Sequence, residues 1–384
     1  MIPLPRGFRA HVTNIGIKDT SDDFTIVAAD HACAAAGVFT RSSFAGPSVV
    51  VSRRHLVDGH ARAVVVVSKN ANVATGDVGL AHAEELAAGV AAALGCAADE
   101  VLVASTGVIG RPYPIERIRA GLAAIPTPLP GDDALSIARG IMTTDTVPKT
   151  AEAAAGAARV VGVAKGVGMI EPDMATMIAV VLTDADIDPP ILDAVFRRVV
   201  DRTFNCVSID TDTSTSDTAV ILASGVAGAV DAAAFERALS EVCGSLARQI
   251  ARDGEGATKL LEVVVDGARD TSQARRVAKA IVNSPLVKTA VHGADPNWGR
   301  VAMAIGKSTT TDEIDQSTVV IRFGDQEVYP VSVDAEGLDR LASYMSGSEV
   351  QIQVDLSTGG AASATVWGCD LSDGYVRINA DYTT

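Results

Sequence analysis

The chain has 384 residues, 48% of them hydrophobic, which is enough apolar sequence to bury a large core in one to three domains. Its formal net charge of −15, with no lysine- or arginine-rich run, argues against a nucleic-acid partner. The apolar runs are much shorter than the roughly 20 residues of a membrane helix, and no signal peptide is visible. With five scattered cysteines and no C-x-x-C pair, we expect a reduced, cytoplasmic protein with no membrane partner.

Short valine- and isoleucine-rich runs alternate with alanine-rich stretches along the chain. Continuous apolar runs predict strands covered on both faces, and apolar residues at helical spacing predict amphipathic helices. The alternation predicts an α/β fold of layered sheets and helices. The predicted strands are 63–68, 101–105, 160–165, 177–183, 218–224, 261–266, 318–323 and 350–356, and the predicted helices are 80–94, 190–204 and 232–252.

Three further segments are predicted from composition. The proline-rich stretch 126–133 is predicted to be a loop, and a soft boundary is predicted near 267–273. Residues 268–384 would then form a smaller domain, while 176–267 would complete the main one. The Thr/Ser/Asp stretch 210–218 is predicted to be a polar loop with local side-chain-to-backbone hydrogen bonds and no catalytic role.

Residues 162–176 carry the strongest chemical signal. A glycine-rich, proline-containing bend is followed at once by the apolar strand that begins at Met177. This junction suits an N-to-O acyl shift, in which the Thr176 hydroxyl attacks the Ala175 carbonyl and the resulting ester is hydrolysed. Cleavage would leave Thr176 as a new N-terminus, whose α-amine has a pKa of ~7.7–8.0 and serves as a built-in base for the hydroxyl.

The sequence resembles the ornithine acetyltransferases, also called glutamate N-acetyltransferases, over nearly its whole length. Six matching stretches in the family's order, besides the cleavage segment, make the resemblance specific. They are 105–110 (STGVIG), 141–146 (IMTTDT), 204–217 (FNCVSIDTDTSTSD), 253–259 (DGEGATK), 295–300 (DPNWGR) and 379–384 (NADYTT).

This resemblance implies a layered α-β-β-α fold with a smaller C-terminal α/β domain. It also implies self-cleavage into an α chain, 1–175, and a β chain, 176–384, two of each forming a heterotetramer. No metal or bound organic cofactor is implied. The implied catalytic residues are Thr176, with Thr106 and Gly107 as the oxyanion hole, and the implied substrate contacts are Lys165, Glu255, Asn379, Thr384 and one of Thr143 and Thr144.

The implied reaction is acetyl transfer from N-acetylornithine to glutamate through an acetyl-Thr176 enzyme. Asp173 stands where many members have an uncharged polar residue. The segment that contains this aspartate is similar to that of the paralogue found with clavulanic acid biosynthesis genes. Both primary arginine synthesis and a specialised pathway therefore stay open. The alternatives are a self-processing N-terminal-nucleophile amidohydrolase or aminopeptidase, and a catalytically silent homologue that acts as a scaffold.

Overall fold

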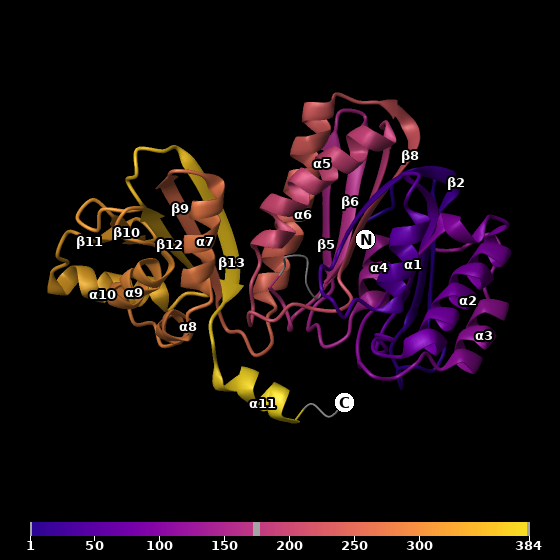
Figure 1. The fold of residues 1–384 in the computed structure, drawn as a ribbon, viewed down its shortest axis with the longest axis horizontal. Coiled ribbons are helices and arrows are strands. Elements are labelled where there is room, and N and C mark those ends of the chain that lie inside the picture. The colour runs from indigo at the N-terminus through magenta and orange to yellow at the C-terminus, as the bar shows by residue number, and fades with distance from the viewer. Residues whose placement is uncertain (1, 172–176, 382–384) are drawn as a thin grey trace. The chain divides into compact units, whose positions relative to one another are not determined.

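The computed structural model describes residues 2–171 and 177–381, which form two compact units (Figure 1). Within these residues, the first unit runs to Asn205 and resumes over Asp212–Leu246. The second holds Cys206–Thr211 and continues from Ala247. The sequence placed the domain boundary between residues 267 and 268. The structure places it between Leu246 and Ala247, within the helix Ala232–Arg252, and strand β9 (Leu260–Ala268) pairs with strands of the second unit.

The first unit is built on one sheet of eight strands in the order β4-β3-β2-β8-β7-β6-β5, with β1 on the side of β2. The long strand β2 joins its two parts: the N-terminal part pairs with β1 and β3, and the C-terminal part pairs with β8. The strands are β1 (Phe8–Thr13), β2 (Phe24–Phe39), β3 (His60–Val67), β4 (Val101–Ser105), β5 (Lys149–Ala155), β6 (Ala158–Lys165), β7 (Ile178–Asp186) and β8 (Thr218–Ala229).

The two parts of this sheet pack face to face, and helices cover the outer face of each part. Val64 of β3 and Val163 of β6 contribute to one core with α4, so the two parts of the sheet share an interior. On the far side of β3, Val65 belongs to a second core with α2, while Gly162 of β6 leaves room for Val242 of α6. The expected α-β-β-α layering is confirmed (Figure 1). The helices are α1 (Pro47–His55), α2 (Gly76–Leu94), α3 (Ile115–Ala123), α4 (Ala134–Ile141), α5 (Pro189–Arg202) and α6 (Ala232–Arg252).

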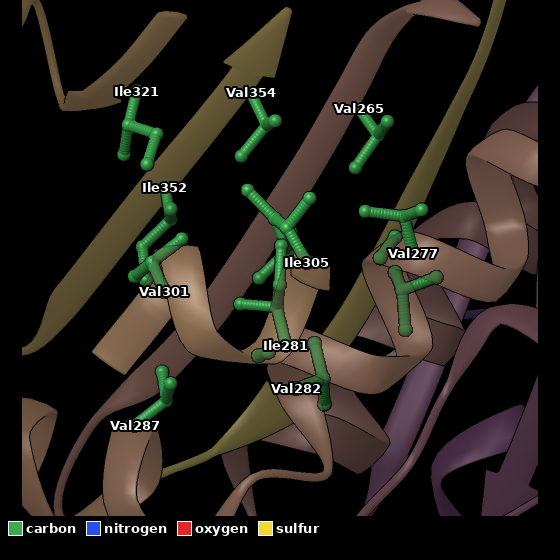
Figure 2. Packing of buried hydrophobic residues seen from close by; sticks show 14 of the residues in the cluster. Val265, Val277, Ile281, Val282, Val287, Val301, Ile305, Ile321, Ile352 and Val354 are labelled. Carbon is green, nitrogen blue, oxygen red and sulfur yellow. The ribbon is translucent and has the colours of Figure 1, made fainter. Parts of the chain in front are cut away.

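The second unit is a smaller α/β domain with a sheet in the order β11-β10-β12-β9-β13. Figure 2 shows Val265 and Ile352 on neighbouring strands and, packed against that face, Ile281 of α7 and Ile305 of α9. The remaining elements are β10 (Val320–Phe323), β11 (Gln326–Tyr329), β12 (Glu349–Asp355), β13 (Ala362–Cys369), α7 (Thr271–Val282), α8 (Pro285–His292), α9 (Trp298–Ser308), α10 (Ala335–Met345) and α11 (Asp373–Asp381).

Every strand and helix predicted from the sequence is present, with ends shifted by a few residues. Strand β2 was missed because its alanine-rich sequence contains Asp30 and His31 and has no long valine or isoleucine run. No helix in the described ranges is long and apolar enough to cross a membrane.

Candidate functional site

Two predicted site residues meet where β4 and β6 end. Lys165 is the last residue of β6, and Thr106 directly follows β4. The Lys165 Nζ donates a hydrogen bond to the Thr106 Oγ1 at 3.1 Å, and both residues are buried. Burying an ammonium group costs free energy unless polar partners replace its water, so the buried Lys165 depends on protein groups such as the Thr106 hydroxyl. Because the Thr106 oxygen accepts from a cation, its own hydroxyl proton is a strengthened donor.

Gly107 occupies a position that no other residue fits. Its φ is +126°, and a Cβ there would lie 2.2 Å from the carbonyl carbon of Lys69. The backbone passes so close that only glycine is tolerated. Within the described ranges, no acceptor engages the Gly107 N–H. This N–H and the Thr106 hydroxyl are adjacent donors of the kind that stabilises an oxyanion.

Asp145 links these strand ends to the loop that carries Thr143. Its carboxylate forms a 2.8 Å ion pair with Lys149, and both side chains are fully buried. It also accepts hydrogen bonds from the Gly166 N–H at 2.7 Å and the Thr143 N–H at 3.0 Å. Burial opposes ionisation of Asp145, but Lys165 and Lys149 outweigh it and lower its pKa to about 2. Sequence reasoning did not name Asp145 as a site residue. It lies in the 141–146 motif, four residues before Lys149, and both facts are visible in the sequence.

The two threonines of the 141–146 motif differ in exposure. Thr143 is half-buried with its N–H held by Asp145, whereas Thr144 is exposed. The backbone of Thr143 is therefore tied to a buried carboxylate.

The second unit brings Glu255 and Asn379 together. The Asn379 Nδ2 donates to the Glu255 Oε2 at 3.0 Å and to the Tyr375 carbonyl at 3.0 Å. Next to Glu255, Gly256 has a φ of +68°, and a Cβ there would lie 2.3 Å from the Tyr375 nitrogen. The glycine thus allows α11 to pack tightly on the turn that presents Glu255. Sequence reasoning named both residues without any signal that they touch.

The strand β7, which follows the predicted cleavage junction, is held on both sides at its start. Lys165 is the antiparallel partner of Ile178, and Thr218 of β8 is its parallel partner. The Met177 N–H donates to the Asp217 Oδ1 at 2.7 Å, and the Met177 carbonyl accepts from the Thr218 N–H at 3.0 Å. Ala175, Thr176 and Thr384 lie outside the described residues.

The chain matches the ArgJ family model over residues 9–384. It is 57% identical over 380 residues to the arginine biosynthesis bifunctional protein ArgJ 2 of Nostoc sp., covering 99% of this chain and 98% of that protein. It is 55% identical over 386 residues to the glutamate N-acetyltransferase Oat2 of Streptomyces clavuligerus, again covering 99% and 98%.

Among solved structures, ArgJ from Bacillus halodurans is 43% identical, covering 52% of this chain and 96% of that one, with a TM-score of 0.49. Ornithine acetyltransferase complexed with ornithine, from Mycobacterium tuberculosis, is 37% identical, covering 44% and 92%, with a TM-score of 0.39. The domain architecture and the polar strand ends are those of a layered α/β enzyme. The chain belongs to the ArgJ family, and the resemblance seen in its six motifs is confirmed.

The buried ion pair predicts a test of how this site is held. Lys149→Ala removes one partner of a fully buried pair and should lower the free energy of unfolding by about 3–5 kcal/mol. The matched control is Arg54→Ala, which removes an exposed pair of the same 2.8 Å length and should change it by less than about 1 kcal/mol. Denaturant unfolding should be followed by circular dichroism, because Trp298 and Trp367 both lie in the second unit. Equal effects of the two substitutions would contradict a structural role for the pair.

Proposed function

We propose that this protein is a glutamate N-acetyltransferase that moves the acetyl group of N-acetylornithine to glutamate through an acetyl-Thr176 enzyme. The observation that carries the proposal is the buried contact of Lys165 with Thr106, next to the unengaged Gly107 N–H and across from the start of β7. Membership of the ArgJ family supports it, since one relative is named a glutamate N-acetyltransferase.

The first event is self-cleavage between Ala175 and Thr176. The Thr176 hydroxyl attacks the Ala175 carbonyl, the peptide C–N bond breaks, and the chain is held by an ester. Water hydrolyses the ester, leaving a carboxylate on Ala175 and a free α-amine and hydroxyl on Thr176. Nucleophile and base then belong to one residue, which removes the need for a separate histidine.

Acetyl transfer follows in two half-reactions. The Thr176 hydroxyl, deprotonated by its own α-amine, attacks the acetyl carbonyl of N-acetylornithine. The negative charge that develops on the carbonyl oxygen is stabilised by the Thr106 hydroxyl and the Gly107 N–H. The ornithine amine takes up the proton and leaves. The amine of glutamate then attacks the ester, and N-acetylglutamate departs with the acetyl group.

The substrate contacts are assigned by charge. Lys165 pairs with the α-carboxylate that both amino acids share, and Glu255 holds an ammonium group with Asn379 beside it. Thr384 and one of Thr143 and Thr144 complete the set. The active form is a heterotetramer of two α chains, 1–175, and two β chains, 176–384, in the cytoplasm, and it needs no metal or organic cofactor.

Self-cleavage predicts two polypeptides from one gene product. Denaturing mass spectrometry should find residues 1–175 and 176–384 as separate chains. Thr176→Ala should stay in one piece and transfer no acetyl group, because it lacks the hydroxyl that acts in both reactions. A wild-type chain that is fully intact yet active would refute the proposal.

The oxyanion role predicts the effect of losing one donor. Thr106→Ala should keep the fold and self-cleave slowly, and the cleaved enzyme should lose ~10²–10³ in kcat. Thr106→Ser, which keeps the hydroxyl, should restore most of it, and Thr127→Ala on an exposed loop should change nothing. An unchanged kcat in cleaved Thr106→Ala would rule this role out.

A covalent acetyl group predicts ping-pong kinetics. Double-reciprocal plots against N-acetylornithine at several glutamate concentrations should be parallel, and N-acetylornithine alone should add one acetyl group to the β chain. Intersecting lines with no acetylated chain after acid quench would indicate direct transfer instead. Release of free acetate at the same rate with and without glutamate would identify a hydrolase.

A further inference from the structure

The residues on both sides of Gly107 are held by the segment that follows β3. The Thr106 N–H donates to the Val67 carbonyl at 3.1 Å, and the Val108 N–H donates to the Lys69 carbonyl at 3.1 Å. The N–H groups that flank Gly107 are therefore taken up by one neighbouring segment. The Gly107 N–H itself has no acceptor among the residues that the structure describes.

This supporting segment, residues 69–74, has an unusual backbone. Lys69, Asn72 and Ala74 have φ values of +73°, +52° and +57°, in the left-handed region that residues other than glycine rarely adopt. Such conformations cost free energy and persist only where surrounding contacts hold them. Here the conformation brings the Lys69 carbonyl oxygen to 2.4 Å from the place where a Cβ of Gly107 would lie. The contacts that fix the supporting segment therefore also limit where Gly107 can lie.

Asn70 supplies contacts that join the supporting segment to the loop after β4. It is buried, and its backbone forms bridges with Thr106 and Val108. Its side-chain Oδ1 accepts the Asn72 N–H at 2.8 Å, and its Nδ2 donates to the Pro112 carbonyl at 3.0 Å. One amide group thus accepts and donates at once, which neither an ionised aspartate nor an aliphatic side chain can do.

Asparagine is also a common turn residue, and the contact of its Oδ1 with the N–H two residues on is an ordinary Asx turn. Asn14 makes the same turn elsewhere: its Oδ1 accepts the Gly16 N–H at 2.7 Å, and its Nδ2 donates to the Lys18 carbonyl at 3.2 Å. Asn14 is exposed, whereas Asn70 is buried. What further distinguishes Asn70 is the acceptor of its amide, because Pro112 lies in the loop after β4.

We propose that Asn70 is a positioning residue for the oxyanion hole: it clamps the supporting segment to the loop after β4 and so holds Gly107, with its N–H unengaged, beside the Thr106 hydroxyl. This rests on the proposed acetyl transfer and deepens it. Asn70 touches no substrate in this role. A donor stabilises a developing negative charge best when it is already in place, so a displaced Gly107 should slow the chemical step more than it weakens substrate binding.

The test variant is Asn70→Ala, which removes both side-chain hydrogen bonds. In the self-cleaved enzyme, the rate of β-chain acetylation at saturating N-acetylornithine should fall by ~10–10², less than for the loss of a donor. The N-acetylornithine concentration that gives half of this rate should change by less than about twofold, because the substrate contacts stay in place. The matched control is Asn14→Ala, which breaks the same turn in another loop and should change neither quantity.

An unchanged acetylation rate in cleaved Asn70→Ala, or a rise in the half-saturating concentration alone, would overturn the proposal. A wild-type chain that never forms an acetylated β chain would instead refute the proposed function.

A second variant covers the case in which Asn70→Ala does not fold or cleave. Asn70→Ser keeps an oxygen that can accept the Asn72 N–H, but its side chain is one atom shorter and lacks the amide that reaches Pro112. It should fold, self-cleave and show the same slowed acetylation. Combined with Thr106→Ala it should lower the rate by the same factor again, because the two substitutions affect different donors. Loss of the effect in that background, or a lower Tm with a normal acetylation rate, would overturn the role assigned through Gly107.

Discussion

The start of β7, fixed between β6 and β8, is the constraint on which the rest of the site depends. Lys165 lies across from Ile178 on one side, and Asp217 and Thr218 hold Met177 on the other. A cation and a carboxyl group thus flank the backbone just after residue 176. Backbone hydrogen bonds on both sides fix the register of β7 to the residue, because a slip by one would send every side chain to the opposite face. The proposed nucleophile, Thr176, is covalently bonded to Met177, whose backbone these contacts hold.

The charged side chains near the end of β6 form a buried network. Lys165 stands near Asp145 and Asp217, and Asp145 is also paired with the fully buried Lys149. Such groups add little to stability when compared with a well-packed apolar core, since desolvation offsets most of their attraction. Their effect is to fix the positions of these side chains and to set the charge near the end of β6. The depressed pKa of Asp145 and the raised pKa of Asp217 show two carboxyl groups driven apart by their surroundings, a common feature of catalytic sites.

The sequence predicts the repeating parts of this fold better than its connections. The valine-rich strands are recognisable as continuous apolar runs, and α6 is recognisable because apolar residues recur along one of its faces. Leu239 and Leu246 have this helical spacing, and both are buried. Strand β2 escapes because it is held by partners on both edges and not by a strong local pattern. Gly107 was named through a motif. The reason that glycine is needed there is the close approach of the Lys69 carbonyl, a contact between distant segments that the sequence does not show. Asp145 and Asp217 were missed because only tertiary structure buries them.

The sheet also explains how the first unit would survive a cut in its chain. A break between residues 175 and 176 opens the connection between β6 and β7 but removes none of their pairing, which runs from Val160 opposite Thr183 to Lys165 opposite Ile178. The β2–β8 ladder joins the same two fragments a second time, from Ala34 opposite Ala223 to Phe39 opposite Thr218. The valines and leucines of both fragments share one core beneath these ladders. A break at that peptide bond would therefore leave every described ladder between the two fragments in place.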